Sequence, residues 1–186
     1  KSAHAFNCDT TLYYSKVLAF MNKKSLRDDL AVIEMKSAAY SYGDELLSEL
    51  NISISQGSFY FLTGPSGSGK TTFLKMCYGS LVPTYGALTI FGKESSDLTR
   101  DEMAYLRRKI GVVHQDCQFL DHLNVNDNIA LPIMVSGQNS LSDNVNLKEL
   151  LNWVGLSHRS KALPPELSGG ERQRAALARA IIMSPD

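Results

Sequence analysis

One octapeptide constrains this chain more than any other feature. Residues 64–71 read Gly-Pro-Ser-Gly-Ser-Gly-Lys-Thr and satisfy the pattern G-x-x-x-x-G-K-[ST] in full. An apolar run at 58–63 precedes them, and a helical pattern begins near Lys70 and extends toward Tyr78. A strand, a glycine-rich loop and a helix in this order are typical of a phosphate-binding loop. The octapeptide therefore predicts an α/β fold that binds a nucleoside triphosphate.

The residue types in this loop suit a strongly anionic ligand. Glycine lets the backbone curl until successive N–H groups converge, and the following helix adds its N-terminal dipole. Lys70 is expected to reach the β and γ phosphates, and the Thr71 hydroxyl to bind Mg²⁺. The predicted nucleotide contacts are the loop and the first residues of the helix: Gly64, Pro65, Ser66, Gly67, Ser68, Gly69, Lys70, Thr71 and Thr72.

Strands and helices alternate along the rest of the chain, which favours an α/β class with a mostly parallel core. Apolar or alternating runs predict strands at 30–35, 51–55, 58–63, 87–91 and 110–113, with 58–63 and 110–113 buried. Predicted helices begin at the capping-box spacing of Thr99 and Glu102, within 124–154, and near Gly170. Pro132 is expected to shorten or kink its helix, and Gly155 to end the next one.

Composition excludes several classes of protein. The 186 residues carry 19 basic and 19 acidic side chains, so the net charge is zero and no nucleic-acid partner is expected. No apolar run approaches the roughly 18 residues that span a bilayer. The three cysteines, Cys8, Cys77 and Cys117, are widely spaced and lack a C-x-x-C pattern, which favours reduced thiols over a zinc site or a disulfide framework.

A second motif narrows the interpretation. Residues 167–173 read Leu-Ser-Gly-Gly-Glu-Arg-Gln and lead into an alanine-rich helix. Ser168 and Glu171 have capping-box spacing, so two glycines lie at a helix N-terminus, which favours anions. The segment closely resembles the signature of ATP-binding cassette (ABC) ATPases. The resemblance implies a P-loop NTPase with a RecA-like parallel sheet, an antiparallel β subdomain and a helical subdomain. It also implies a homodimer in which Ser168, Gly169 and Gly170 cap the γ-phosphate of ATP held by the other copy.

The same resemblance assigns two further positions. Gln115 follows the predicted strand at 110–113 and matches the Q-loop glutamine, which approaches Mg²⁺ and the attacking water. Tyr42 lies 28 residues before Lys70 and matches the aromatic that stacks on adenine, with Tyr40 as the rival. The family usually has an aromatic where His114 stands, and we assign no chemistry to this histidine.

Residues 58–186 resemble most closely the bacterial cell-division ATP-binding proteins of the FtsE family. Two features carry this resemblance: the residues that flank the phosphate loop, and the segment at 121–132, which reads Asp-His-Leu-Asn-Val-Asn-Asp-Asn-Ile-Ala-Leu-Pro. This resemblance implies a polytopic FtsX-type membrane partner and a peripheral position on the cytoplasmic face of the inner membrane. The partner would contact residues 115–132, where Phe119, Leu120 and Leu123 belong either to that groove or to the core. An ATPase subunit of a lipoprotein-releasing or macrolide exporter remains the alternative.

No apolar run followed by Asp-Glu, the Walker B pattern, follows the signature helix in the printed sequence. We therefore expect that the chain is cut before Walker B, that it lacks the C-terminal part of the fold, and that it binds ATP without turnover. A truncated nucleotide-binding module that acts only by docking is the further alternative. The expected organisation is an extension over 1–29 and a partial ABC domain over 30–186, with its helical subdomain at about 118–165.

Overall fold

A computed structural model of the chain describes residues 31–42, 45–137 and 141–186. These residues form two compact units, which we describe separately. The first unit extends to residue 73 and includes 82–96, and the second comprises 74–81 and 97–186. The predicted extension at 1–29 lies outside the described residues.

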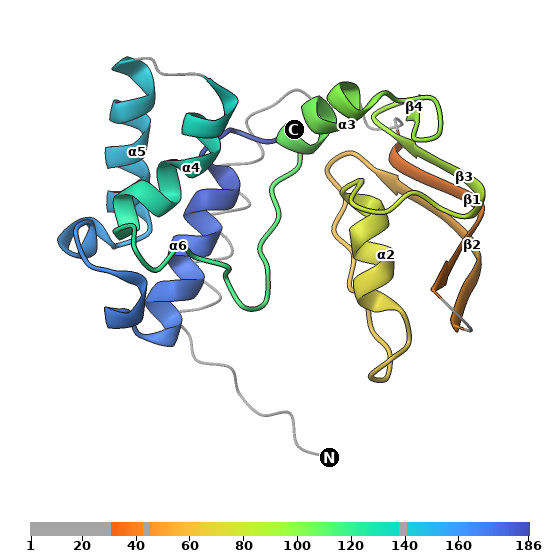
Figure 1. Cartoon of the computed structure of the whole chain (residues 1–186), viewed down its shortest axis with the longest axis horizontal. Helices are drawn as coiled ribbons and strands as arrows, with labels where there is room; N and C mark the ends of the chain where they lie inside the picture. The colour runs from red at the N-terminus through yellow and green to blue at the C-terminus, as the bar shows by residue number, and fades with distance from the viewer. Residues whose placement is uncertain (1–30, 43–44, 138–140) are drawn as a thin grey trace. The chain divides into compact units, whose positions relative to one another are not determined.

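The first unit contains a four-stranded antiparallel sheet in the order β2-β1-β3-β4 (Figure 1). Its strands are β1 (Ala31–Tyr42), β2 (Glu45–Ser55), β3 (Tyr85–Ile90) and β4 (Lys93–Glu94). The predicted strands at 30–35, 51–55 and 87–91 are thus confirmed, and the first two are longer than expected. Alternate residues of β3 point to one face, where Leu88 and Ile90 are buried together with Met35 of β1.

A local irregularity in β1 bends this sheet. Ser37 has a φ of 45°, and its backbone N–H donates to the side-chain Oδ1 of Asn51 at 2.8 Å instead of following a regular ladder. Gly86 lies opposite, where an added Cβ would lie 2.2 Å from the carbonyl oxygen of Ser37. Only glycine permits this close approach, so the bulge and Gly86 form one feature.

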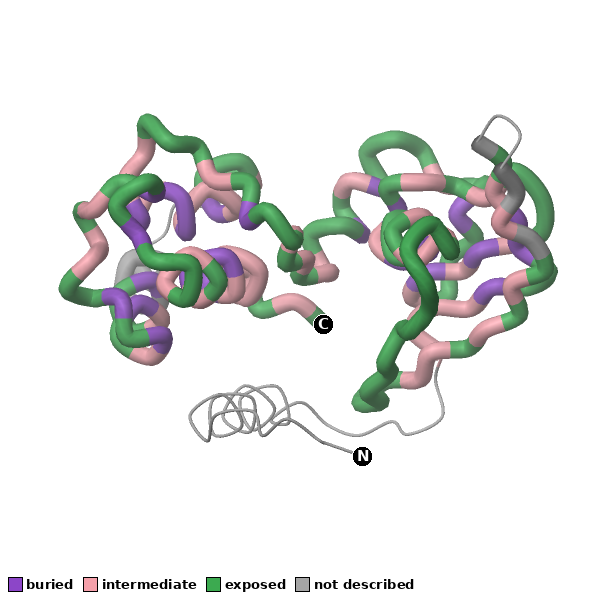
Figure 2. Tube along the Cα trace, turned by 90° about the horizontal axis from the view of Figure 1, so that it is seen from below, coloured by how far each residue is buried: buried purple, intermediate pink, exposed green. Residues whose placement is uncertain are grey.

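The prediction of buried strands at 58–63 and 110–113 is wrong. Neither segment is a strand in the structure, and residues 56–68 are exposed throughout, as the green stretch in Figure 2 reflects. Phe59 and Phe61 are 70% and 84% exposed. In the part of the chain that the structure describes, the sheet is antiparallel and offers these runs no neighbouring strand. Apolar composition favours burial, but a strand forms only where a partner satisfies its backbone groups.

The second unit is helical. It contains α3 (Arg100–Arg108), α4 (Val125–Ser136), α5 (Leu141–Trp153) and α6 (Gly169–Ile181), with short 3-10 helices η1 (Ser157–Arg159) and η2 (Pro164–Glu166). Helix α4 packs between α5 and α6 (Figure 1). The core side chains are Val125, Ile129, Leu147, Leu151, Val154, Leu156, Ala175, Ala176 and Ala178. A further helix, α2 (Lys70–Cys77), begins in the first unit and ends in the second.

The predicted helix ends in this unit are confirmed. Thr99 caps α3 with a complete capping box, and Gly155 follows α5 with a φ of 69°. Pro132 does not end its helix, because α4 continues beyond it to Ser136 and ends at Gly137 in the left-handed conformation; the predicted kink stays a prediction. No helix among the described residues has the length and apolar character that a membrane span needs.

Candidate functional site: the phosphate loop and the signature helix

The phosphate loop folds around the side chain of its own lysine. Lys70 Nζ donates to the carbonyl oxygens of Gly64 at 2.9 Å and Pro65 at 2.5 Å, and to Ser68 Oγ at 3.3 Å. The ammonium group therefore lies over the loop that is predicted to hold phosphate. Neutral carbonyls are weaker acceptors for an ammonium than phosphate oxygens, so an anionic ligand can draw Lys70 away from the loop.

Two glycines give the loop its curvature. Gly67 and Gly69 both have a φ of +81°, a conformation that L side chains rarely adopt. Gly69 is also close to Leu47 of β2, because an added Cβ would lie 2.9 Å from Leu47 Cδ1. Leu47 is the strand partner of Tyr40, so this end of the β1–β2 pair contacts the loop.

The predicted adenine-stacking residue Tyr42 is the last residue of β1 and pairs with Glu45. Its rival Tyr40 is half-buried two residues earlier. Both tyrosines therefore belong to the strand segment whose partner strand contacts Gly69. The position of the strand does not separate the two candidates.

The N-terminus of α2 is open to an anion. Phe73 N–H donates to the Gly69 carbonyl at 2.9 Å and starts the helix, and no acidic side chain lies in its first turn. Its dipole is therefore not offset by a carboxylate of its own first turn. Thr71 is exposed, Thr72 is half-buried and Phe73 is buried. The first turn of the helix therefore packs through the Phe73 side chain, and the Thr71 hydroxyl remains accessible.

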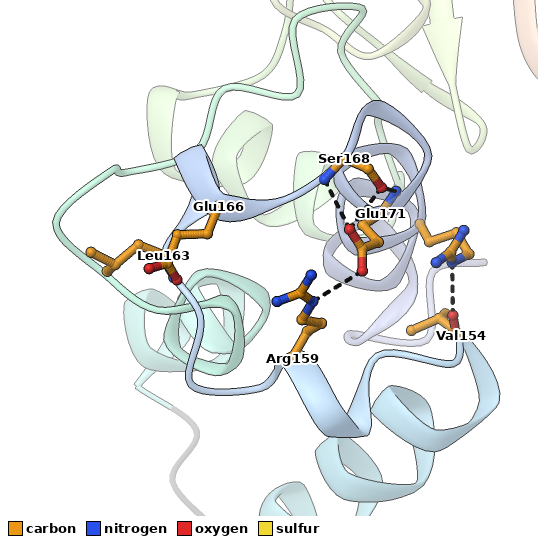
Figure 3. Close-up of polar contacts among 7 residues, drawn as sticks. Val154, Arg159, Leu163, Glu166, Ser168 and Glu171 are labelled. Carbon is orange, nitrogen blue, oxygen red and sulfur yellow. Dashed lines mark hydrogen bonds and ion pairs between the residues drawn. The ribbon is translucent and has the colours of Figure 1, made fainter.

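The signature segment forms a tightly bonded helix start (Figure 3). Ser168 Oγ accepts a hydrogen bond from Glu171 N–H at 3.3 Å. Glu171 Oε2 accepts from the Ser168 backbone N–H at 2.8 Å and from its hydroxyl at 2.7 Å. Arg159 of η1 donates from Nε to Glu171 Oε1 at 3.2 Å. The capping box predicted from the spacing is confirmed, and Arg159 is an additional contact that the spacing does not predict.

These hydrogen bonds fix the charge of Glu171. The Ser168 hydroxyl, then the Ser168 backbone N–H, and to a smaller extent Arg159 lower the pKa of Glu171 to about 2. The carboxylate is therefore ionised at any physiological pH. Gly169 and Gly170 are exposed, and an added Cβ at Gly169 would meet no atom within 4 Å. The backbone amides at this helix start are thus accessible to a ligand.

Gln115 lies at the tip of a turn. Cys117 N–H donates to the His114 carbonyl at 3.0 Å and closes the turn, and the Gln115 side chain is exposed. His114 is half-buried and meets the Tyr78 ring edge-to-face, with 6.2 Å between ring centroids. The His114 side chain therefore has a packing role.

The segment after this turn contacts α6 and α4. Phe119 is half-buried beneath the guanidinium groups of Arg172 and Arg179, and Leu120 remains 42% exposed. Asn128 of α4 is fully buried and bonds Leu120 through both N–H and C=O. Sequence reasoning missed Arg179 and Asn128. An arginine within an alanine-rich helix and an asparagine inside an apolar helical run were the available signals.

The structure groups the predicted residues within each unit. In the first, the loop residues and Lys70 lie together, with the β1–β2 strands beside them. In the second, Ser168, Gly169 and Gly170 open α6, and the turn of Gln115 is bonded to the same helix through Arg179.

The chain is similar to known proteins over most of its length. The family model described as ABC transporter matches residues 47–186. The chain belongs to this family. A Cell division ATP-binding protein FtsE of Bacillus subtilis (strain 168) is 40% identical over 83% of the chain and 69% of its own length. A Lipoprotein-releasing system ATP-binding protein LolD 1 of Rhodopirellula baltica is 39% identical over 84% of the chain and 70% of its own length.

A solved structure gives the same result for the fold. A dimeric bacterial ABC transporter cassette superposes with a TM-score of 0.73 and 32% identity, over 82% of the chain and 70% of the cassette. The chain is accordingly an ATP-binding subunit of the ABC class with an α/β fold. Both relatives named above are ATP-binding proteins by name, and one name refers to cell division while the other refers to a lipoprotein-releasing system.

Proposed function

We propose that this chain is the ATP-binding subunit of a bacterial cell-division complex and works with a polytopic membrane protein of the FtsX type. The observation that carries the proposal is the 40% identity to a cell-division ATP-binding protein, which extends over 83% of the chain. The subunit would lie peripherally on the cytoplasmic face of the inner membrane. Its membrane partner would contact residues 115–132, where the 42% exposure of Leu120 supports an accessible surface.

The proposed nucleotide is ATP with Mg²⁺. Loop amides and the α2 dipole would hold the phosphates, while Lys70 would exchange the carbonyls of Gly64 and Pro65 for phosphate oxygens. Mg²⁺ supplies charge neutralisation at the phosphates when it is bound. The resemblance to ABC ATPases assigns the metal to the Thr71 hydroxyl and the Gln115 side-chain oxygen, and each of these side chains is exposed in its own unit.

The remaining contacts would complete the nucleotide site. Tyr42 would stack on adenine, with Tyr40 as the rival. Ser168, Gly169 and Gly170 would cap the γ-phosphate of ATP bound to a second copy of the chain, which makes the working form a homodimer. The accessible, glycine-containing start of α6 supports this role. The expectation that these 186 residues do not hydrolyse ATP stays a prediction.

A second candidate function rests on the 39% identity to a lipoprotein-releasing ATP-binding protein. Lys70→Ala introduced into the chromosomal gene of the organism that encodes the chain separates the two candidates, because a subunit that does not bind ATP inactivates the complex to which it belongs. The cell-division proposal predicts elongated, undivided cells with normally localised lipoproteins. Normal division with lipoproteins retained in the inner membrane would contradict it and favour the exporter. Expression of Lys75→Ala, an exposed change in the same helix, is the control and is expected to leave both processes normal.

A further inference from the structure

Arg179 of the signature helix donates hydrogen bonds to the turn that displays Gln115. We propose that Arg179 is a positioning residue for Gln115, because it fixes the exit of this turn and connects it to the helix that begins after Ser168. The inference rests on the proposed function in one respect, the contact of Gln115 with the Mg²⁺ of a bound nucleotide. The positional claim itself concerns the described residues of the second unit.

The backbone of this turn is strained at its exit, although Cys117 N–H donates to the His114 carbonyl and Gln118 N–H donates to the Asp116 carbonyl at 2.8 Å. Cys117 and Gln118 have φ values of 59° and 42°, so two consecutive residues with side chains adopt the left-handed region. That region is unfavourable for any L-residue other than glycine, and it persists only where surrounding contacts determine it. Without an external brace, this segment would relax and carry Gln115 to a different position.

Arg179 provides that brace. Its Nη1 donates to the Gln118 carbonyl at 2.8 Å, and its Nη2 donates to the Cys117 carbonyl. The two bonded carbonyls belong to the two left-handed residues. The guanidinium also lies over the Phe119 ring, with 4.9 Å from Cζ to the ring centroid. A planar fork that binds two carbonyls and stacks on a ring is a geometry that lysine does not reproduce.

Burial supports a structural use of this arginine. Arg179 is half-buried, and burial lowers its pKa, while the fields of Cys117 and Asp116 act in the opposite direction. An arginine stays protonated in either case, so the brace is present throughout the physiological pH range. The contact therefore acts as a permanent tie, and not as a pH switch.

The helix extends this tie to the signature segment. Arg179 lies eleven residues after Ser168 in the same helix, which corresponds to about 16 Å along the axis. Helix α6 is continuous from Gly169 to Ile181, and its alanine face is buried against the core. A displacement of the signature end would therefore move the turn of Gln115 in the same step.

The test compares Arg179→Lys with a matched change on the same helix. Arg174 donates from Nε to the Val154 carbonyl at 3.0 Å, so Arg174→Lys also removes an arginine–carbonyl bond but lies away from the turn. The readouts are the ¹H–¹⁵N signals of the Gln115 side-chain amide and of residues 114–119, and amide exchange at 117–119. We expect Arg179→Lys to shift these signals and to accelerate exchange at least about 10-fold. Arg174→Lys is expected to leave both unchanged.

A second variant keeps the result interpretable if Arg179→Lys loosens the whole unit. Gly favours the left-handed region, so Gln118→Gly in the Arg179→Lys background is expected to restore part of the exchange protection at residue 117. Unshifted Gln115 signals in Arg179→Lys, or equal shifts in both lysine variants, would overturn the proposal. No protection gained from Gln118→Gly would also count against it.

The nucleotide readout separates this inference from the proposed function. In the 186-residue chain, Mg²⁺ should tighten ATP binding. Arg179→Lys should reduce this Mg²⁺ effect as Gln115→Ala does, without changing the affinity for Mg²⁺-free ATP. If the unmodified chain binds no ATP, the proposed function fails, and the NMR comparison alone decides whether Arg179 positions Gln115. If ATP binds and the Mg²⁺ effect survives Arg179→Lys, the positioning role fails alone.

Discussion

The two segments that we propose to bind phosphate are built in different ways. The signature segment at 167–173 is held by bonds among near neighbours, Ser168 with Glu171, plus one contact from Arg159. The phosphate loop at 64–71 is bonded mainly to its own lysine, and the apolar run before it is exposed. The conformation of a motif whose hydrogen bonds join near neighbours is determined by the local sequence. The conformation of a motif that needs a neighbouring strand also depends on distant residues.

The largest expected effect is a loss of ATP affinity when the lysine of the phosphate loop is replaced. Lys70→Ala removes the group that bonds the loop carbonyls and is proposed to meet the phosphates. A hydrogen bond to a charged group contributes about 1.5–3 kcal/mol, so ATP affinity should fall about 10- to 150-fold. Calorimetric titration measures this, with Lys75→Ala as the control of equal charge change. Equal affinities in the two variants would show that Lys70 does not contact the ligand.

Next in size is the effect of glycine substitution in the loop. Gly67→Ala and Gly69→Ala share a φ of +81°, and the backbone strain alone should cost about 1–2 kcal/mol in each. Only Gly69→Ala also meets Leu47, whereas Gly67 faces open space. Thermal unfolding should therefore show a larger loss of stability for Gly69→Ala. Leu47→Ala should remove the difference between the two; if the difference stays, the contact does not cause it.

A smaller effect is expected at the signature helix. Ser168→Ala removes the N-cap and should lower the free energy of unfolding by about 1 kcal/mol, or about 2–4 °C in Tm. Thr99→Ala removes the matching cap of α3, with the same capping-box geometry, and should have a similar effect. Urea denaturation compares the two variants. A Ser168→Ala loss several times larger than that of Thr99→Ala would mean that more than local capping holds the signature segment.

The smallest expected effect is a dependence on pH. The pKa of Glu171 is lowered from 4.5 to about 2, so its bonds contribute fully above pH 4.5 and are lost as the pH falls toward 2. A ¹³C titration of the carboxyl group should show a midpoint near pH 2. In Ser168→Ala the midpoint should move up toward 4.5, because the Ser168 hydroxyl is the largest cause of the lowered value. An unchanged midpoint would assign the effect to another group.

Sequence reasoning succeeded where a residue's conformation is decided by its neighbours in the chain. The caps at Thr99 and Ser168 and the left-handed Gly155 followed from spacing and residue type. It failed for the strands at 58–63 and 110–113, because pairing partners are not encoded in a run of apolar residues. It also missed Arg179, whose contacts at Cys117 and Gln118 are 62 and 61 residues away. Contacts between residues so far apart in the chain can be predicted only when the position of the helix in the folded unit is known.

The most direct test of this account is a map of ATP binding on the chain by ¹H–¹⁵N NMR. With Mg²⁺ present, the account predicts that signals of residues 64–72 shift as ATP is added, and that the same titration of Lys70→Ala shows almost none of these changes. Shifts that spare residues 64–72, or that persist undiminished in Lys70→Ala, would contradict the assignment of this loop as the ATP site.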